Sequence, residues 1–313
     1  VNSIEEVIKE AKLCNSKGMG ITGGDPLTKV NRCVDYIKAL KNEFGKKFHV
    51  HLYTSFILVN EENLKKLYEA GLDEIRFHPD FKNKTNWNKI DLARKFKWKI
   101  GIEIPCIPDL RNETLEVIEF FKYKVDFFNL NELEAADSER NMVFNMGYKS
   151  KDTYSYGILG SEELAFEIMK KYGKSKLNIH FCTSKLKNIE QLGNRIKLRA
   201  ENIKQHFDKV TKGGSLIRGA IFTEKPSFNY TKLLKLKNKE LEIKKLEELK
   251  NKICTDLKIK NKDLVIDQIK YRLLTYKKIV IKNKLKLKKM NLFPAIVEEL
   301  ATGDLFEIET EFL

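Results

Sequence analysis

The sequence lacks most of the features that would assign it to a special class of protein. No apolar run approaches the 18 or so residues that cross a bilayer, and no charged segment followed by an apolar core indicates a signal peptide. The cysteines are few and odd in number, and no pair has CxxC spacing: Cys14, Cys33, Cys106, Cys182 and Cys254. Neither a disulfide framework nor a zinc site within the chain is therefore indicated. We expect a cytoplasmic protein in a reducing compartment, without membrane contact.

Negative charge is scarce in one part of the chain. The formal net charge is +15, and residues 232–289 contain 20 Lys/Arg against 7 Asp/Glu, which gives this block +13. Such a block can bind RNA or another polyanion. However, lysine dominates, arginine is nearly absent and aromatic residues are sparse. Because Lys-, Glu- and Ile-rich composition is typical of thermophile proteins in general, a merely solvated face is the alternative interpretation.

Strands and helices alternate along the first two thirds of the chain. Apolar periodicity predicts helices at 4–15, 27–44, 61–70, 86–96 and 111–123, and strands at 18–22, 48–53, 74–77, 99–104 and 126–130. A polar segment at 135–160 is expected to be an insertion or lid. A helix at 162–172, a strand at 177–182 and a long helix at 186–210 follow. This alternation predicts an α/β domain with a parallel sheet, either a (β/α) barrel or an open sheet.

The pattern changes after Gly213 and Gly214, where we place a domain boundary. The expected elements are a strand at 216–222, a charged helix at 231–253, a solvent-facing strand at 278–288, a short helix at 294–302 and a strand at 305–313. They predict a small basic α+β domain with antiparallel character over 213–313. The basic strand 278–288 could pair with the acidic strand 306–311, which would neutralise part of the block.

The segment KGMGITGGDPL, residues 17–27, is the most informative stretch. A short strand runs into Gly23 and Gly24, where the absence of Cβ atoms lets a ligand approach the backbone. The carboxylate of Asp25 can accept hydrogen bonds from an amine, and Pro26 sets the turn into the next helix. An ordinary βα turn, which is often rich in Gly and Pro, is the simpler interpretation.

Polar residues follow several of the predicted strands. Ligands of βα folds bind at the carboxyl ends of the strands, which gives these candidates: Gly23, Gly24, Asp25, Thr54, Ser55, Arg76, His78, Glu103, Asn129, Asn131 and Glu132. For the last three, a helix cap or turn is equally consistent. His49 and His51 share a strand face at a spacing that can hold a metal, but without a third ligand a structural role is favoured. For Cys106 and Cys182, a buried apolar role is favoured.

Six segments carry a family resemblance when they are taken together and in order. They are ITGGDPL (21–27), HLYTS (51–55), IRFHP (75–79), GIEIPCIP (101–108), NLNELE (129–134) and HFCTSKLKN (180–188). With them the sequence resembles the radical S-adenosylmethionine (radical SAM) superfamily, and more closely an archaeal group of uncharacterised proteins related to the pyruvate formate-lyase activating enzyme. The resemblance covers about residues 1–210. It implies a partial (β/α) barrel of radical SAM type over 1–212.

The resemblance also implies cofactors and site residues. S-adenosylmethionine (SAM) would place its amino group at Gly23, Gly24 and Asp25, although most family members carry Glu where this chain has Asp25. Thr54 and Ser55 would lie near the sugar or carboxylate of SAM, Arg76 near the SAM carboxylate or a substrate anion, and Glu103, Asn129 and Asn131 near ribose and adenine. A reduced [4Fe–4S] cluster, supplied by an electron donor, would cleave SAM to a 5′-deoxyadenosyl radical that abstracts hydrogen from an unknown substrate.

The chain departs from the family in one respect. The cluster of the family is bound by a CxxxCxxC motif that precedes the Gly-Gly loop, and no such motif occurs here. Because the chain begins Val1-Asn2-Ser3, we expect the first βα unit and the cluster loop to lie upstream, and the chain alone to have no cluster and no turnover. Evolutionary loss of the cluster is the alternative. A ligand- or RNA-binding barrel without radical chemistry is the second functional hypothesis. A phosphate-binding barrel enzyme fits less well, because its glycine loops come late in the barrel.

Overall fold

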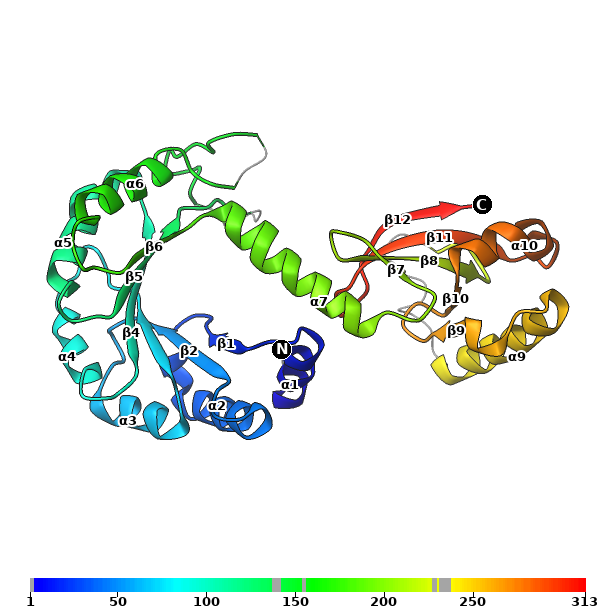
Figure 1. Ribbon diagram of the computed structural model, residues 1–313, viewed down its shortest axis with the longest axis horizontal. Coiled ribbons are helices and arrows are strands. Elements are labelled where there is room, and N and C mark those ends of the chain that lie inside the picture. The colour runs from blue at the N-terminus through cyan, green and yellow to red at the C-terminus, as the bar shows by residue number, and fades with distance from the viewer. Residues whose placement is uncertain (1–2, 137–141, 154–155, 227–229, 231–237) are drawn as a thin grey trace. The chain divides into compact units, whose positions relative to one another are not determined.

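The computed structural model describes residues 3–136, 142–153, 156–226, 230 and 238–313, and it divides into two compact units (Figure 1). The first unit comprises Val1–Lys12 and Ser16–Gln191, and the second comprises Leu13–Asn15 and Leu192–Leu313. This division by contacts falls about twenty residues before the boundary at 212–213 that the sequence suggests. The boundary at 212–213 remains a prediction about how the chain divides into folding domains.

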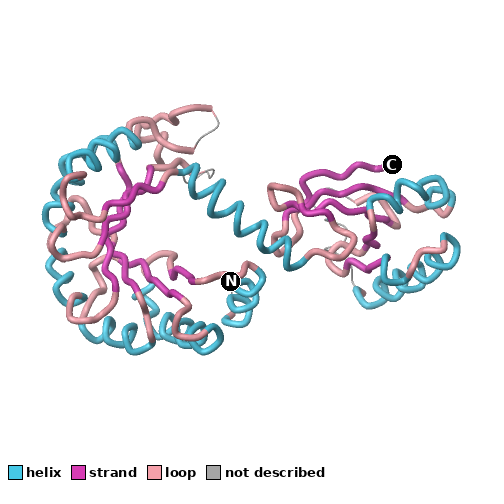
Figure 2. Tube along the Cα trace, in the orientation of Figure 1, coloured by secondary structure: helices cyan, strands magenta, loops and turns pink. Residues whose placement is uncertain are grey.

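The first unit contains a parallel six-stranded sheet in the order β1-β2-β3-β4-β5-β6. Its strands are β1 (Gly18–Ile21), β2 (His49–Thr54), β3 (Glu74–Phe77), β4 (Lys99–Cys106), β5 (Phe127–Glu132) and β6 (Ile179–Cys182). Its helices are α1 (Ile4–Leu13), α2 (Val30–Phe44), α3 (Glu61–Ala70), α4 (Ile90–Ala93), α5 (Arg111–Phe121) and α6 (Ser161–Tyr172). Short 3-10 turns lie at Pro26–Lys29, Trp87–Lys89 and Pro108–Leu110, and a π-helix at Leu186–Leu192. Helices α2–α6 cover the convex side of the curved sheet (Figure 2), so the predicted partial barrel is confirmed.

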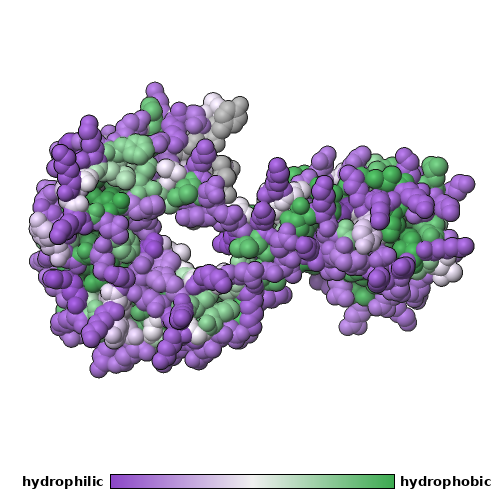
Figure 3. All heavy atoms as spheres, viewed as in Figure 1, coloured by the Kyte–Doolittle hydropathy of each residue, from purple (hydrophilic) through white to green (hydrophobic). Residues whose placement is uncertain are grey.

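Residue alternation decides which face of the sheet meets the helices. In β2, Val50, Leu52 and Thr54 are buried, while the residues between them are half-buried. Successive strand residues point to opposite faces, so one face packs against the helices and the other lines the concave side. Hydrophilic residues are prominent along this hollow (Figure 3). A closed apolar core would exclude such residues, so this face carries groups that a polar ligand could contact.

Local sequence signals set the ends of several elements in the first unit. The Ser3 hydroxyl accepts from the Glu6 amide at 3.2 Å, as a capping box at the start of α1 requires. The side chain of Asn60 caps α3 by accepting from the Asn63 amide, and Gly71 ends this helix in a left-handed conformation. The apolar face that α3 buries includes Leu64, and burial of such a side chain is worth roughly 1.5–3 kcal/mol. These signals are local, and the sequence predicted the element correctly.

Two predictions for residues 99–210 need adjustment. β4 continues through Pro105 to Cys106 instead of ending at Pro105. The long helix expected over 186–210 ends at Ile203, and Lys209–Val210 form the short strand β7. The predicted insertion at 135–160 is joined to itself and to the end of β5 by bridges pairing Glu134 with Gly157 and Ser150 with Ile158. Residues 137–141 and 154–155 of this segment lie outside the described residues.

The second unit is an antiparallel sheet in the order β12-β11-β8-β10-β9, with β7 paired to β8. The remaining strands are β8 (Ser215–Phe222), β9 (Leu264–Asp267), β10 (Arg272–Thr275), β11 (Phe293–Leu300) and β12 (Glu307–Phe312). Its helices are α7 (Gly193–Ile203), α9 (Lys239–Leu257) and α10 (Lys277–Lys289), with a 3-10 turn at Asn261–Asp263. Ile221 and Leu273 of the sheet share an apolar cluster with Ile253 of α9 and Val280 of α10. In the parts of the chain that are described, no helix combines the length and apolar character that a bilayer crossing requires.

Two predictions in this unit are wrong. Residues 278–288, which alternate like a solvent-facing strand, lie in helix α10, because the helical period places Val280 and Leu287 together in the core and leaves Leu285 exposed. Residues 294–302, rich in Ala, Glu and Leu, mainly form β11, whose backbone pairs with β8 on one side and β12 on the other. Tertiary pairing overrides the helical propensity of this segment. The expected neutralisation of basic strand 278–288 by strand 306–311 therefore does not occur. Of the helix predicted at 231–253, residues 231–237 lie outside the described part, and α9 begins at Lys239.

Candidate functional site

The Gly-Gly loop is held at the carboxyl end of β2 by the side chain of Asp25. One carboxylate oxygen accepts from the Leu27 amide at 3.0 Å and from the Thr54 hydroxyl at 2.7 Å. The other accepts from the Ser55 amide at 3.1 Å and the Ser55 hydroxyl at 2.6 Å. Burial raises the pKa of Asp25, but the hydrogen bonds from Ser55, Thr54 and Leu27 outweigh it and hold the pKa below its usual value. The carboxylate is therefore ionised and its acceptor positions are used within the chain.

The loop itself requires glycine. Gly23 has φ +102° and Gly24 has φ +55°, a region that L side chains rarely adopt, although a Cβ at either position would meet no atom within 4 Å. Both residues are exposed. A cavity of about 420 Å³ adjoins the loop and is lined in part by Met19, Ile21 and Tyr36. The loop thus presents bare backbone to a space of ligand size.

A second group of predicted residues meets on the concave face. The Arg76 guanidinium donates to Glu103 at 2.8 Å, to Glu74 at 2.6 Å and to the Tyr53 hydroxyl at 3.0 Å. The Asn131 amide donates to the other Glu103 oxygen at 3.0 Å. The network follows from strand register, since Tyr53 is opposite Arg76 and Glu103 is opposite Asn129. Arg76 is therefore already paired with two carboxylates.

Glu103 and Asn129 complete this network. Burial raises the pKa of Glu103, but hydrogen bonds from Asn131, Asn129 and Arg76 hold it below its usual value, so this side chain is a carboxylate at neutral pH. The side-chain oxygen of Asn129, Oδ1, is buried and has no hydrogen-bond partner among the described residues. A buried acceptor without a partner is costly, and a ligand hydroxyl or amine would satisfy it. This is the second feature of the concave face that suits a polar ligand.

The other candidates have structural partners. The His78 ring forms a hydrogen bond with the backbone carbonyl oxygen of Glu103 at 2.9 Å. Glu132 is buried, pairs with Lys151 at 2.6 Å, and accepts from the Ser184 amide at 2.7 Å. Glu132 therefore ties the segment after β5 to the loop after β6. Sequence analysis missed Lys151 and Tyr53, since neither follows a strand end where candidates were sought. The predicted residues around Asp25 and those around Glu103 thus form two groups, and His78 links them, because its amide donates to the Thr54 carbonyl oxygen at 2.9 Å while its ring contacts Glu103.

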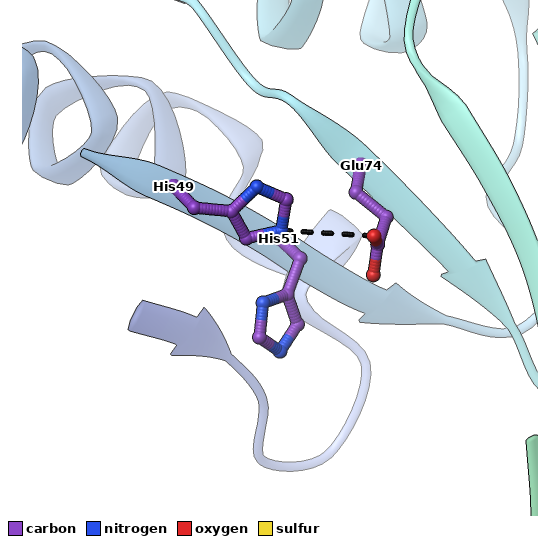
Figure 4. Close-up of side chains that lie close together, drawn as sticks. All are labelled: His49, His51 and Glu74. Carbon is purple, nitrogen blue, oxygen red and sulfur yellow. Dashed lines mark ion pairs between the residues drawn. The ribbon is translucent and has the colours of Figure 1, made fainter. Parts of the chain in front are cut away.

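Among the described residues, no cysteine belongs to a group of possible metal ligands. Burial raises the pKa of Cys106 to about 12 and also raises the pKa of Cys182 and Cys33, so the thiol forms dominate at neutral pH. Within the described residues, a different trio of possible ligands lies close together, namely His49, His51 and Glu74 (Figure 4). Burial lowers the pKa of His51 to about 4, and Arg76 acts in the same direction, so this ring is neutral at pH 7.

Comparisons with known proteins place these features in a family context. No protein-family model matches the chain. Over 228 residues it is 45% identical to a protein of Methanocaldococcus jannaschii whose provisional name is glycyl-radical enzyme activating enzyme. The chain is a relative of the radical SAM activating enzymes. The match covers 70% of this chain and 60% of the M. jannaschii protein, so the chain spans less than two thirds of that relative's length. The resemblance inferred from the six motifs is confirmed.

Solved structures resemble the chain more distantly. SuiB of Streptococcus suis, solved with S-adenosylmethionine bound, has a TM-score of 0.40 and 16% identity, covering 57% of this chain and 40% of SuiB. Methylornithine synthase has a TM-score of 0.41 and 14% identity, covering 56% and 54%. An enolase-superfamily protein from Polaromonas has a TM-score of 0.39 and 10% identity, covering 69% and 55%. Because these scores are low, we transfer no residue role from these structures to this chain.

Proposed function

We propose that the protein containing this chain is a radical SAM enzyme and that the chain supplies its SAM-binding half barrel. The observation that carries the proposal is the exposed Gly23-Gly24 loop, fixed by Asp25 at the carboxyl edge of the sheet in a relative of activating enzymes. Ligands of βα folds bind at this edge. When bound, SAM would supply the adenosyl group from which the family forms its radical.

The chemistry of the loop suggests which atoms would hold SAM. An ammonium group needs acceptors, and the Asp25 carboxylate already accepts four hydrogen bonds. The carbonyl oxygens of Gly23 and Gly24 would therefore receive the amino group, while Asp25, Thr54 and Ser55 position the loop. On the concave face, the unpartnered Asn129 oxygen would accept from a ribose hydroxyl. Arg76, Glu103 and Asn131 would hold that face in shape rather than bind a free anion.

The residues of this chain do not fit a [4Fe–4S] cluster. Such a cluster needs thiolates close together, whereas Cys106 and Cys182 are buried thiols with raised pKa, and the trio in the described residues that could hold a metal contains no cysteine. We therefore derive no step through the cluster. Its ligands, and the electron donor that serves it, belong to the proposal for the longer protein.

The reaction partner is also part of the proposal. The provisional name of the M. jannaschii relative points to a glycyl-radical enzyme. By that likeness, the substrate from which hydrogen is abstracted would be a protein. The described part of residues 135–160 exposes large apolar side chains, among them Met146 and Leu159, as a contact surface would.

SAM binding by the 313-residue chain tests the proposal directly. We expect isothermal titration calorimetry to detect SAM binding. Gly24→Val should weaken this binding at least tenfold by straining the loop. Gly45→Val is the matched control, because Gly45 also has positive φ and open space around it, yet lies at the end of α2. Equal binding by the two variants, or none by the unaltered chain, would contradict the assignment of the loop. The full-length gene product, reconstituted anaerobically with iron and sulfide, should release 5′-deoxyadenosine from SAM.

A second function, polyanion binding, is favoured by helix α10. All seven of its lysines are exposed, it contains no acidic residue, and no ion pair within the described residues involves any of them: Lys277, Lys278, Lys282, Lys284, Lys286, Lys288 and Lys289. The acidic strand β12 pairs with β11 instead. We propose RNA or another polyanion as the ligand of this helix, either beside radical chemistry or, in the alternative hypothesis, without it.

A further inference from the structure

Two histidines and a glutamate converge on the concave face of the sheet. His49 and His51 lie two residues apart on β2, so their side chains leave the same face. The register of β2 and β3 places Glu74 directly opposite His51. One nitrogen from each ring and one carboxylate oxygen lie within 4.8 Å of one another (Figure 4). Strand pairing thus supplies the third ligand that the sequence pair lacked.

The individual atoms are placed as ligands would be. The His49 Nε2 atom lies 3.6 Å from one Glu74 oxygen, while the other oxygen accepts from Arg76. The His51 Nδ1 atom is buried and has no hydrogen-bond partner among the described residues. The other ring nitrogen, Nε2, contacts the Tyr53 hydroxyl at 3.3 Å. A buried Nδ1 without a partner requires an explanation, and a metal ion bound at this nitrogen provides one.

The neighbouring strand leaves room for these rings. β1 reads Gly-Met-Gly-Ile, and its register places Gly18 opposite His49 and Gly20 opposite His51. A Cβ at Gly20 would lie 2.6 Å from the His51 Nε2 atom. Glycine weakens a strand and often marks a close approach. Gly20 therefore keeps open the space in which the His51 ring sits, whereas a Cβ at Gly18 would meet the His49 carbonyl oxygen at 2.5 Å.

The local charge is compatible with a cation. Arg76 brings one positive charge near the trio, but it pairs with both Glu74 and Glu103. Together the Arg76, Glu74 and Glu103 side chains carry a formal charge of −1. A divalent ion would therefore enter a site of negative net charge. Arg76 would orient Glu74 through its hydrogen bond to the carboxylate, as outer partners of metal ligands often do.

We propose that His49, His51 and Glu74 bind one divalent transition-metal ion, with Zn²⁺ the best-fitting case. Two imidazoles and one carboxylate suit Zn²⁺, Fe²⁺ and Co²⁺, and three protein ligands leave a position for water or another ligand. Ligand atoms around tetrahedral Zn²⁺ lie about 3.3 Å apart, so the trio needs a contraction of about 1.5 Å at most. His49, whose side chain is 44% exposed, is free to make it.

The site is separate from the Gly-Gly loop. His49 and Glu74 are the first residues of their strands, whereas Thr54 and Ser55 lie at and just beyond the carboxyl end of β2. At about 3.3 Å per residue, five positions along β2 correspond to roughly 16 Å. From His51, the separation is three positions, or roughly 10 Å. The metal would therefore lie toward the amino ends of the strands, beside Arg76, and the inference does not depend on SAM binding.

Metal titration of the chelator-stripped 313-residue chain tests the inference. We expect one Zn²⁺ or Co²⁺ per chain, measured by competition with a chromophoric chelator. His51→Ala and Glu74→Gln should each weaken binding at least about 100-fold. The matched control is His180→Ala, an exposed histidine on β6 of the same sheet, which should bind as the unaltered chain does. Circular dichroism confirms that each variant is folded. Gly20→Ala should weaken the same site without removing a ligand.

Three outcomes would overturn the inference. The first is no binding tighter than a millimolar dissociation constant. The second is equal affinity in the control and in the folded ligand variants. The third is a thiolate charge-transfer band in the Co²⁺ spectrum, which would assign the metal to cysteine. Weak visible Co²⁺ bands of nitrogen–oxygen coordination, lost in His51→Ala, would support the site.

Discussion

Replacing Asp25 with Asn should loosen the Gly-Gly loop by a predictable amount. Each carboxylate oxygen of Asp25 receives one backbone N–H and one hydroxyl. An asparagine has only one accepting oxygen, so whichever way its amide lies, either the Leu27 or the Ser55 amide loses its acceptor. The hydroxyl on that side can rotate and accept instead. One hydrogen bond is therefore lost, and a second is reversed.

The magnitude follows from the kind of bond that is lost. A hydrogen bond to a charged group contributes roughly 1.5–3 kcal/mol. Asp25 is half-buried, so we take the lower part of this range and expect Asp25→Asn to cost about 2 kcal/mol at pH 7. Its pKa is held below the ordinary 3.8, so the contribution is present above that pH and is lost as the pH falls through the folded-state value. The difference between Asp25→Asn and the unaltered chain should shrink on acidification.

Urea unfolding followed by tryptophan fluorescence measures the loss of stability in the first structural unit, which contains Asp25. The two tryptophans, Trp87 and Trp98, are both buried in the first unit, so the signal does not report the second. Asp80→Asn is the matched control, because one oxygen of Asp80 accepts from the Lys82 and Asn83 amides and an asparagine can keep both bonds. We expect it to cost below about 0.5 kcal/mol. Equal destabilisation by the two changes would refute the saturation of Asp25.

Three further predictions concern other parts of the chain. Lys151→Met leaves the buried Glu132 carboxylate without its cation and should lower the free energy of unfolding in urea by about 3 kcal/mol. The exposed control Lys65→Met should lower it by less than about 0.5 kcal/mol, and a loss in Lys151→Met no larger than in this control would contradict the buried pair. Cys106, with its pKa raised to about 12, should resist a thiol reagent at pH 8 in the folded chain, while the partly exposed Cys254 reacts; mass spectrometry distinguishes them. Replacing Lys282, Lys284 and Lys286 of α10 with Gln should lower the salt dependence of RNA binding, with a log–log slope about 2 units shallower, whereas an unchanged slope would remove α10 from the interface.

The sequence determined the first unit to a large extent. Its helices and strands bury one face each, and this requirement places apolar residues at a regular period within each segment. Asn60 and Gly71 fix the ends of α3, and Gly23 and Gly24 mark the loop, because these signals act through neighbouring backbone atoms. The motif order also carried the family resemblance. The apolar period, the helix ends and the glycine loop are each encoded within a short segment, so they can be recognised from the sequence without knowing which segments pair.

The second unit shows where local information failed. Residues 278–288 alternate as a strand would, yet the segment became α10 because Val280 and Leu287 can join the core together only in a helix. Residues 293–300 became β11 because two neighbouring strands pair with their backbone. Neither neighbour can be recognised from the segment itself. The error also changed the interpretation of charge, since α10 keeps its lysines exposed.

Tertiary structure alone decided how the candidate side chains are used. The sequence placed Asp25, Thr54 and Ser55 at strand ends, but only the fold revealed that the three bond one another and that the carboxylate has no acceptor left. Likewise, His49 and His51 were visible as a pair, while Glu74 joined them through the register of β2 and β3. Residue type and spacing along one strand are written in the sequence. Which residue of another strand lies opposite depends on long-range pairing, which a single segment does not encode.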